Sequence, residues 1–410
     1  MTMTSDRPQP TFRLSMLIYD TRYRSITIQV FVLLLVLATG YWLVDNLIRN
    51  LAALGRGIDF RFLTDTSNYD INQRLIEYNS QSTHARAWAV GLLNTLLVAL
   101  VGCVLATVIG VVAGVLRLSR NWVVARLMTV YVEAMRNVPL LLWILIIYVI
   151  ATETLPQPRA AEMVFWDSAV FTNRYIGIPG PVFDRDLGSL NLVYFSVGYN
   201  TLLVFLVLAA SLFVVSRMRT AARLTQEATG ERPVIWWKAA LVIVVPLTLV
   251  KIWLGLHLDY PELRGFNFTG GIIMNNSFFA LTAALALYTS AFIAEIVRSG
   301  ILAISRGQTE AAYALGLQPG RTMSLVVLPQ ALRIIIPPLI SQYLNLTKNS
   351  SLAIAIGYMD LVATLGGITL NQTGRGLEAI LLVMLTYLVI SLVISAAMNA
   401  YNKSVQLKER

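Results

Sequence analysis

The sequence predicts an all-α integral membrane protein of about eight spans with both termini in the cytoplasm, and three observations predict it. Hydrophobic residues occupy 56% of the 410 positions and charged residues only 13%, whereas a soluble domain carries about 25% charged residues. Eight apolar stretches are long enough to cross roughly 30 Å of hydrocarbon, some of them with tilt or with polar ends. With the N-terminus inside, most of the 32 Lys and Arg residues fall on the cytoplasmic side, as the positive-inside bias requires. The expected spans are residues 26–46, 88–116, 127–152, 191–215, 239–257, 275–297, 334–357 and 379–400.

The first span follows a basic N-terminal segment, residues 1–25, that resembles the start of a signal peptide. However, the apolar run ITIQVFVLLLVLATGYWLVDN is longer than a typical signal core and ends without a small-x-small cleavage site. We therefore expect residues 26–46 to stay in the membrane as an anchor, with a cytoplasmic tail, residues 401–410, at the other end of the chain.

Two long polar segments, residues 47–87 and 153–190, interrupt the apolar pattern on the outer side. The second contains PQPRAAEM and IGIPGPVFDRD, whose Pro and Gly content predicts an irregular, exposed loop. On the inner side, RMRTAARLTQEATGERPVIWWK joins the fourth and fifth spans with five basic residues and two tryptophans, which are typical of a membrane interface.

Several classes of site are not expected in this chain. Its one cysteine, Cys103, excludes an internal disulfide, and its two histidines, His84 and His257, share no metal-ligand spacing. The formal charge of +10 follows from membrane topology, so no nucleic-acid partner is expected. The chain has no G-x-x-x-x-G-K-[ST] loop to hold ATP phosphates, and we expect it to contain no cofactor.

A short cytoplasmic helix is predicted between the sixth and seventh spans, in SRGQTEAAYALGLQPG. Ser305 and Gln308 have the spacing of a capping box, and Thr309 is a second candidate for the N-cap. Gly316 is suited to the left-handed conformation that ends a helix, and Pro319-Gly320 favours a turn. The helix is too short to cross a membrane and too short to be stable alone in water.

Two interpretations of this helix are open, a docking element for another protein and an amphipathic helix on the lipid surface. The helix lacks the Trp, Phe and Leu face that lipid-bound helices use, and its small residues permit close approach to a partner, so docking is favoured. The residues assigned to docking are Glu310, Ala311, Ala312, Leu315 and Gly316.

The segment EAAYALGLQPGRTMSLVVLPQALRIIIPPL resembles the EAA-loop signature of permease subunits of binding-protein-dependent ABC importers. The positions that fill the signature are Glu310, Ala311, Ala312, Gly316, Leu328 and Pro329. The flanking stretches YTSAFIAEIVRSGILAISRGQ and LNLTKNSSLAIAIG, together with LRLSRNWVVARLMTVYVEAMRNVPLLLWILIIYV, resemble the polar amino-acid class of these permeases.

This resemblance implies a type I ABC importer fold, in which residues 310–316 form the coupling helix seated on an ATPase subunit. The permease domain would cover residues 88–400, with core spans in 88–152 and 275–400. Residues 153–270 would then be an insertion that carries two extra spans, and residues 47–87 a periplasmic loop. Such long chains resemble the general amino-acid permease branch, which implies broad specificity for L-amino acids.

The resemblance also implies partners and a location. The chain would be a non-catalytic permease in a bacterial inner membrane, and two separate ATPase subunits would use ATP and Mg²⁺. A second permease subunit is required, and the elaborate N-terminus and insertion favour a different, shorter chain. A periplasmic solute-binding protein would deliver the amino acid.

A substrate site is predicted around Lys348, because a charge inside a span is expensive and indicates function. From a helix start near Ile334, Lys348 would lie about 21 Å along the helix, among Asn345, Asn349 and Ser350. A cation among amides and hydroxyls suits a carboxylate, and KNSS is similar to the Lys-Asp-Thr-Ser pattern of the class. Tyr288 is a further candidate on the translocation path. Alternatively, Lys348 reaches a lipid headgroup or a carboxylate such as Asp360.

Two other functions compete with the importer hypothesis. A secondary amino-acid transporter or channel driven by an ion gradient would often bury acidic or histidine relays near mid-membrane, and the expected spans bury none near their centres. A membrane-embedded enzyme would need a nucleophile with its base or a metal cluster, which two scattered histidines do not provide. Glu295 and Arg298, three positions apart, are expected to form a structural or gating pair.

Overall fold

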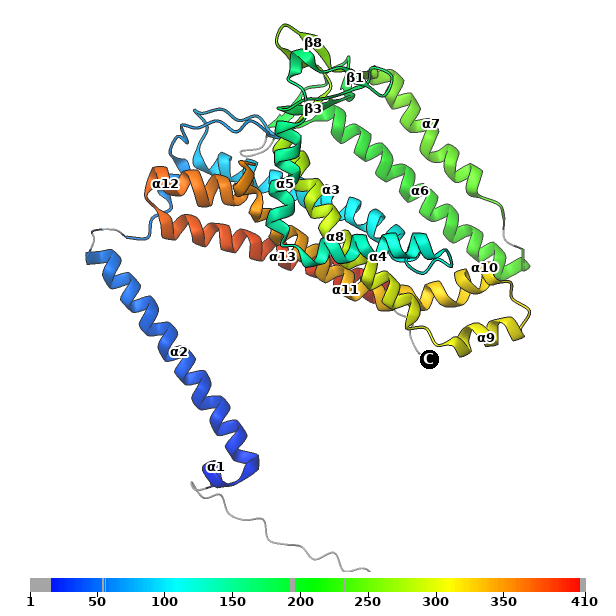
Figure 1. Ribbon diagram of the computed structural model, residues 1–410, viewed down its shortest axis with the longest axis horizontal. Helices are drawn as coiled ribbons and strands as arrows, with labels where there is room; N and C mark the ends of the chain where they lie inside the picture. The colour runs from blue at the N-terminus through cyan, green and yellow to red at the C-terminus, as the bar shows by residue number, and fades with distance from the viewer. Residues whose placement is uncertain (1–15, 54, 56, 192–195, 232, 406–410) are drawn as a thin grey trace, which may run out of the picture. The chain divides into compact units, whose positions relative to one another are not determined.

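The computed structural model describes residues 16–53, 55, 57–191, 196–231 and 233–405, which form two units, residues 1–60 and 61–410 (Figure 1). The first unit contains α1 (Met16–Tyr19) and the long helix α2 (Thr21–Ala53). The expected span 26–46 lies within α2, whereas residues 1–15 of the expected cytoplasmic N-terminus and residues 406–410 of the expected tail lie outside the described residues.

The second unit is mainly helical, and helices α3, α8, α11 and α13 pack together at its centre (Figure 1). Its helices are α3 (His84–Leu116), α4 (Trp122–Asn137), α5 (Leu140–Glu153), α6 (Tyr199–Thr229), α7 (Trp236–Leu254), α8 (Asn276–Leu302), α9 (Arg306–Ala314), α10 (Pro319–Thr322), α11 (Leu328–Asn349), α12 (Leu370–Thr373) and α13 (Gly376–Val405). Short 3₁₀ turns cover Arg61–Thr64, Pro158–Ala160 and Ser350–Ile356, and π-helical segments cover Met323–Val327 and Val362–Thr369.

Seven helices among the described residues are long and apolar enough to cross a membrane, and α4 with α5 makes an eighth candidate span. The prediction of about eight spans in a mainly helical chain is therefore confirmed.

Helices α3 and α8 approach each other closely because small residues lie at their contact. A Cβ atom added to Gly110 would lie 2.7 Å from Ile293, and one added to Gly114 would lie 2.7 Å from the backbone oxygen of Ala294. Small residues four apart permit this approach between membrane helices. Helix α8 is also the most buried of the candidate spans among the described residues, with 67% of an 18-residue apolar stretch buried.

The expected third span, 127–152, differs from the structure, which bends there by 105° between α4 and α5. Pro139 lies at the bend, and Val138 before it is extended, with φ of −103° and ψ of 134°. Proline removes a backbone donor and disfavours a helical conformation in the preceding residue, so one continuous helix cannot pass this position.

Two other span boundaries were wrong. Helix α6 begins at Tyr199 and continues to Thr229, beyond the expected 191–215, because its basic extension is rich in good helix formers and ends only at Gly230, with φ of 76°. Residues 192–195 of the expected span lie outside the described residues. Helix α11 begins at Leu328 instead of Ile334 and ends at Asn349, where a 3₁₀ turn replaces the rest of the expected span.

Residues 153–190, which were expected to form an irregular loop, instead contain short strands, as do residues 196–198 and 256–275. These strands lie at the opposite end of α8 from α9 (Figure 1). A four-stranded antiparallel sheet has the order β1-β2-β3-β10, with Ile178 opposite Ile272, and three two-stranded ladders accompany it. The β8–β9 hairpin turns at Gly265, with φ of 69°. The strands are β1 (Met163–Val164), β2 (Ala169–Phe171), β3 (Tyr175–Ile178), β4 (Gly180–Phe183), β5 (Ser189–Asn191), β6 (Ser196–Gly198), β7 (Leu256–Asp259), β8 (Glu262–Arg264), β9 (Asn267–Thr269) and β10 (Ile272–Asn275).

Candidate coupling and substrate sites

The short helix expected before Gly316 is present as α9. Its N-cap is Ser305 rather than Thr309, and the side chain of Ser305 makes no capping hydrogen bond. The backbone N–H of Gln308 donates to the backbone oxygen of Ser305 at 3.1 Å, so the predicted capping box is not formed. A backbone turn holds the helix start instead.

The end of α9 is a Schellman motif centred on Gly316, which has φ of 79°. The N–H of Leu317 donates to the oxygen of Ala312 at 3.1 Å, and the N–H of Gly316 donates to that of Tyr313 at 2.9 Å. These two bonds satisfy carbonyls that the helix end leaves free. The prediction that Gly316 ends the helix in the left-handed conformation is confirmed.

One face of α9 is covered by this chain and the other is open. Ala312 is 3% exposed, whereas Leu315 is 82% exposed and Tyr313 49% exposed. Glu310 and Ala311 are also exposed. The residues assigned to docking therefore divide into one inward anchor, Ala312, and an accessible surface.

Helix α9 is tied to the next span. The side chain of Gln330 on α11 donates to that of Gln308 on α9 at 3.4 Å, and Thr322 between the two helices is buried. From Pro319 onward the chain is helical without a break as far as Ile356. A short turn and one side-chain hydrogen bond thus join α9 to a long continuous helix.

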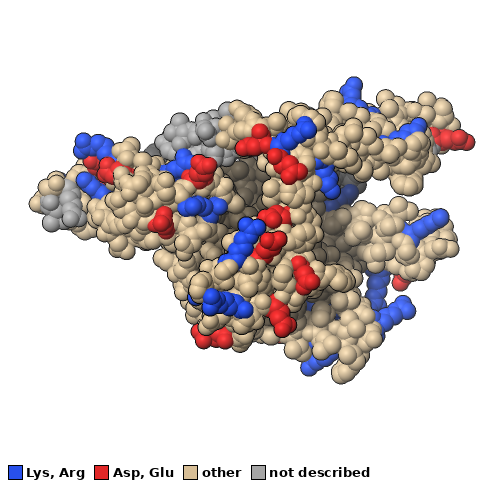
Figure 2. Space-filling model, turned by 90° about the horizontal axis from the view of Figure 1, so that it is seen from above, with Lys and Arg blue, Asp and Glu red and all other residues tan. Residues whose placement is uncertain are grey.

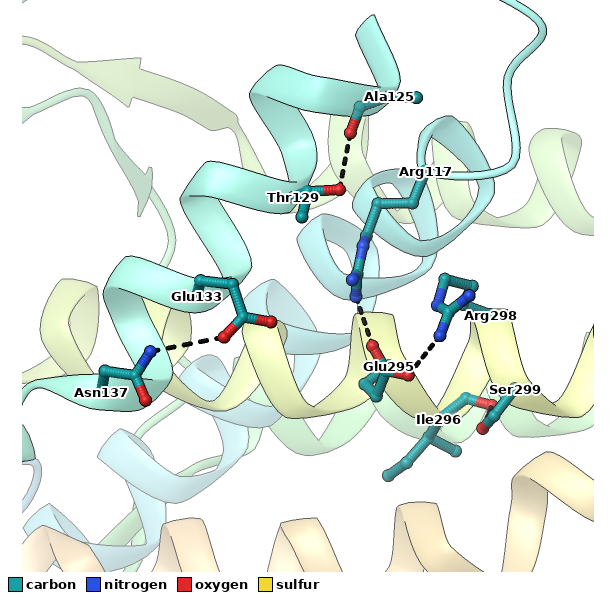
Figure 3. Close-up of polar contacts among 9 residues, drawn as sticks. All are labelled: Arg117, Ala125, Thr129, Glu133, Asn137, Glu295, Ile296, Arg298 and Ser299. Carbon is teal, nitrogen blue, oxygen red and sulfur yellow. Dashed lines mark hydrogen bonds and ion pairs between the residues drawn. The ribbon is translucent and has the colours of Figure 1, made fainter. Parts of the chain in front are cut away.

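A charged cluster joins α3 to α8 near their C-terminal ends (Figure 3). Glu295 accepts from Arg117, and it pairs with Arg298 at 2.9 Å. The side chain of Arg117 is only 8% exposed, so its pairing with Glu295 satisfies a nearly buried cation. Sequence reasoning found the Glu295–Arg298 pair but missed Arg117, because 178 positions separate it from Glu295.

The predicted substrate residues on α11 lie at its C-terminal end. Lys348 and Asn345 are exposed and Asn349 is partly buried, whereas Ser350 is fully buried and donates to the backbone oxygen of Thr347 at 2.8 Å. Lys348 thus lies next to the last residue of α11, which begins at Leu328 and ends at Asn349.

Lys348 lies in a groove of about 460 Å³ between α11 and α13, which is lined mainly by apolar side chains, Val362, Val383, Met384 and Leu388, together with Ser351, Tyr387 and Ser391. Asp360, the alternative partner, is fully buried, and its carboxylate accepts from the N–H of Ala363 at 2.8 Å and from the hydroxyl of Tyr387 at 3.4 Å. Among the described residues, no carboxylate lies within ion-pair distance of Lys348.

Tyr288 lies apart from the Lys348 groove. It is partly buried on α8, where its ring lies 5.1 Å from that of Phe292 and packs against the central apolar core. None of Tyr288, Asn345 and Asn349 is among the described residues that line the groove. The structure thus groups Lys348, Asn345 and Asn349 at one helix end and leaves Tyr288 in the packing between helices.

Comparison with known proteins identifies similar chains over the full length. A family model described as "Binding-protein-dependent transport system inner membrane component" matches residues 106–407. The chain is 58% identical to the glutamate/glutamine/aspartate/asparagine transport system permease protein BztB of Rhodobacter capsulatus, over 100% of both chains. It is 44% identical to the general L-amino acid transport system permease protein AapQ of Rhizobium johnstonii, over 98% of this chain and 96% of that protein. It is also 44% identical to the putative amino-acid ABC transporter permease protein YhdX of Escherichia coli K12, over 90% of this chain and 91% of that protein.

Proposed function

Because this chain belongs to the family of inner membrane components of binding-protein-dependent transport systems, we propose that it is the permease subunit of an ATP-driven importer that carries several L-amino acids across a bacterial inner membrane. The observation that carries this proposal is the 58% identity, over the whole of both chains, to a permease named for transport of four amino acids. The 44% identity to a general L-amino acid permease supports broad specificity.

The energy would come from two separate ATPase subunits that use ATP and Mg²⁺. Their closure on ATP would move the exposed surface of α9, including Glu310, Ala311 and Leu315, and the rigid turn at Gly316 would pass that movement to α11. A ligand-driven change of state requires contacts that differ between the two states. Glu295 pairs with Arg117, at the end of α3, and with Arg298 on α8. Such a movement would break and re-form these two contacts.

The remaining partners are a second, shorter permease subunit and a periplasmic solute-binding protein. Lys348 would hold the α-carboxylate of the amino acid, with Asn345 and Asn349 supplying hydrogen bonds. An ammonium with no carboxylate partner is available for this purpose, and a charge-assisted hydrogen bond to a carboxylate is stronger than a neutral one. Ser350, which is buried, would position the end of α11, and Tyr288 would act through the packing of α8.

The test is reconstitution in proteoliposomes of this chain, the second permease subunit and the two ATPase subunits, with the binding protein outside and ATP inside. The proposal requires uptake of amino acids that depends on ATP and on the binding protein, and ATPase activity that rises with binding protein loaded by each transported amino acid. Uptake by this chain alone on an ion gradient, without ATP, would instead support the secondary transporter.

A further inference from the structure

A polar pocket of about 420 Å³ lies at the end of the second unit that carries the strands, which is the outer end if the basic residues face the cytoplasm. Five stretches of chain line it, namely residues 72–73, 148–152, 173–174, 275–277 and 356–359. Figure 2 shows the molecule from above, with basic and acidic side chains interspersed on this face.

Two of these stretches come from the parts that the core of the permease domain does not need. Asn173 and Arg174 belong to the insertion 153–270, and Gln73 belongs to the outer segment 47–87. The segments predicted as additions therefore meet helices α5 and α8 at this pocket.

Three residues that line the pocket carry buried amide oxygens without a hydrogen-bond partner among the described residues. Asn276, which is 2% exposed, donates its side-chain N–H groups to the backbone oxygens of Thr172 at 2.9 Å and Ala151 at 3.3 Å. Its buried Oδ1 has no hydrogen-bond partner among the described residues, and the same holds for Oε1 of Gln73 and Oδ1 of Asn173. Buried acceptors are normally satisfied, whereas these three buried oxygens, which belong to residues that line the pocket, each lack a donor in the described part of the chain.

One cation accompanies the amide oxygens. Arg174 is exposed and lines the pocket, and no carboxylate of the described residues lies within ion-pair distance of it. None of the described residues that line the pocket is Asp, Glu, Lys or His. A single guanidinium beside several acceptor oxygens matches a zwitterion, since the guanidinium can bind a carboxylate and the oxygens can accept from an ammonium.

The pocket walls are held in place without a ligand. Asn94 on α3 is fully buried and donates to the backbone oxygens of Gln73 at 2.8 Å and Met359 at 2.9 Å. The hydroxyl of Tyr358 donates to the backbone oxygen of Asn94 at 3.2 Å. A preorganised pocket does not spend binding free energy on ordering its own side chains.

The pocket is connected to Lys348 by a short piece of chain. The 3₁₀ turn Ser350–Ile356 starts directly after Asn349 and ends at the pocket, where Gly357 has φ of 69°. Seven residues at about 2.0 Å each place the two sites roughly 14 Å apart along this turn.

We propose that this outer pocket is an acceptor site that receives the amino acid from the binding protein before it reaches Lys348. Arg174 binds the α-carboxylate, and the oxygens of Gln73, Asn173 and Asn276 accept from the ammonium. Because no carboxylate lines the pocket to hold a cationic side chain, it selects L-amino acids with amide, acidic or neutral side chains. The inference rests on the proposed transport of amino acids and adds to it a second substrate-binding site and a substrate preference.

The test uses the whole assembled transporter in lipid nanodiscs, without binding protein, and measures equilibrium binding of radiolabelled L-glutamine. The Lys348→Ala variant serves as the background, so that binding reports the outer pocket. Adding Arg174→Gln should weaken binding roughly tenfold or more, because a charge-assisted hydrogen bond is lost. Arg264→Gln, a change to another exposed arginine of the same insertion that pairs with Glu262, should leave binding unchanged.

A second variant tests the selectivity. Asn173→Asp adds a carboxylate to the pocket and should increase the ability of L-arginine to compete with L-glutamine. No saturable binding in the Lys348→Ala background, or equal binding with and without Arg174→Gln, would overturn the acceptor site. The same holds if Arg174→Gln raises only the concentration of binding protein needed to stimulate the ATPase, since the pocket would then be a docking contact. In each case ATP-driven uptake by the wild-type assembly would leave the proposed function intact, whereas its absence would refute that function.

Discussion

Replacement of Gly316 by alanine separates the conformation of the α9 turn from its surroundings. A Cβ atom at this position would meet no other atom within 4 Å, so the substitution adds no steric clash. Its cost is conformational, since φ is 79° and an L-residue in the left-handed region costs about 1–2 kcal/mol. That cost lowers the ratio of native to non-native turn by about 5- to 30-fold.

If the ATPase subunit binds α9 only in its native turn, its affinity for the permease falls by up to the same factor, because the apparent affinity scales with the fraction of α9 in that turn. We expect Gly316→Ala to raise the concentration of ATPase subunit needed for half-maximal uptake, measured by titrating purified subunit onto the permease in proteoliposomes. Gly316→Asn should have a smaller effect, because asparagine tolerates the left-handed conformation better.

Gly320→Ala is the matched control. A Cβ atom there also meets nothing within 4 Å, but Gly320 lies in helix α10 without a positive φ, where alanine is favoured over glycine by about 0.5–1 kcal/mol. Wild-type affinity and uptake in Gly316→Ala, or an equal loss in Gly316→Ala and Gly320→Ala, would refute the argument that the turn transmits movement.

Three further predictions concern the membrane-embedded part. Lys348→Ala should raise the KM for uptake of all transported amino acids alike, and loss confined to acidic ones would show that Lys348 binds a side chain instead. Glu295→Gln leaves a nearly buried cation unpaired and should lower the free energy of unfolding by about 1–3 kcal/mol. A thermal-shift assay measures the loss, and in it Glu262→Gln, in an exposed pair, should have at most a small effect. Equal shifts for the two variants would contradict the importance of the Glu295–Arg117 pair. Gly110→Ala forces α3 away from α8 and should cost about 1–3 kcal/mol, whereas Gly40→Ala, which meets nothing within 4 Å, should not; intact stability in both would show that the contact yields.

Local signals in the sequence predicted the parts of the fold that depend on neighbouring residues. Apolar length predicted the spans, and Gly316 before Pro319 predicted the stop of α9. Pro139 also carries a signal for the bend between α4 and α5, but the surrounding run is apolar enough to predict a single span. The capping box failed because the Ser305-x-x-Gln308 spacing permits side-chain capping without requiring it.

Contacts between distant segments could not be predicted in this way. The outer pocket brings together Gln73, Arg174 and Asn276, which no spacing rule relates, and Arg117 reaches Glu295 only because α3 packs on α8. The strands of the insertion are two to four residues long, too short for alternation to be visible beside their Pro and Gly residues. The position of Lys348 next to the end of α11 was not predicted, because the boundaries of α11 depend on the π-helical segment before it and the 3₁₀ turn after it.

The most direct test of the coupling role of α9 is a cross-link from its exposed end. Cys103 is the only cysteine of the chain, so Leu315→Cys in a Cys103→Ala background supplies a single thiol at a side chain that is 82% exposed. In the assembled, transporting complex we expect this thiol to cross-link to a cysteine introduced in the ATPase subunit, with a yield that changes when ATP binds. A thiol that never cross-links to that subunit and stays open to water-soluble or lipid-soluble reagents, while uptake continues, would contradict the account.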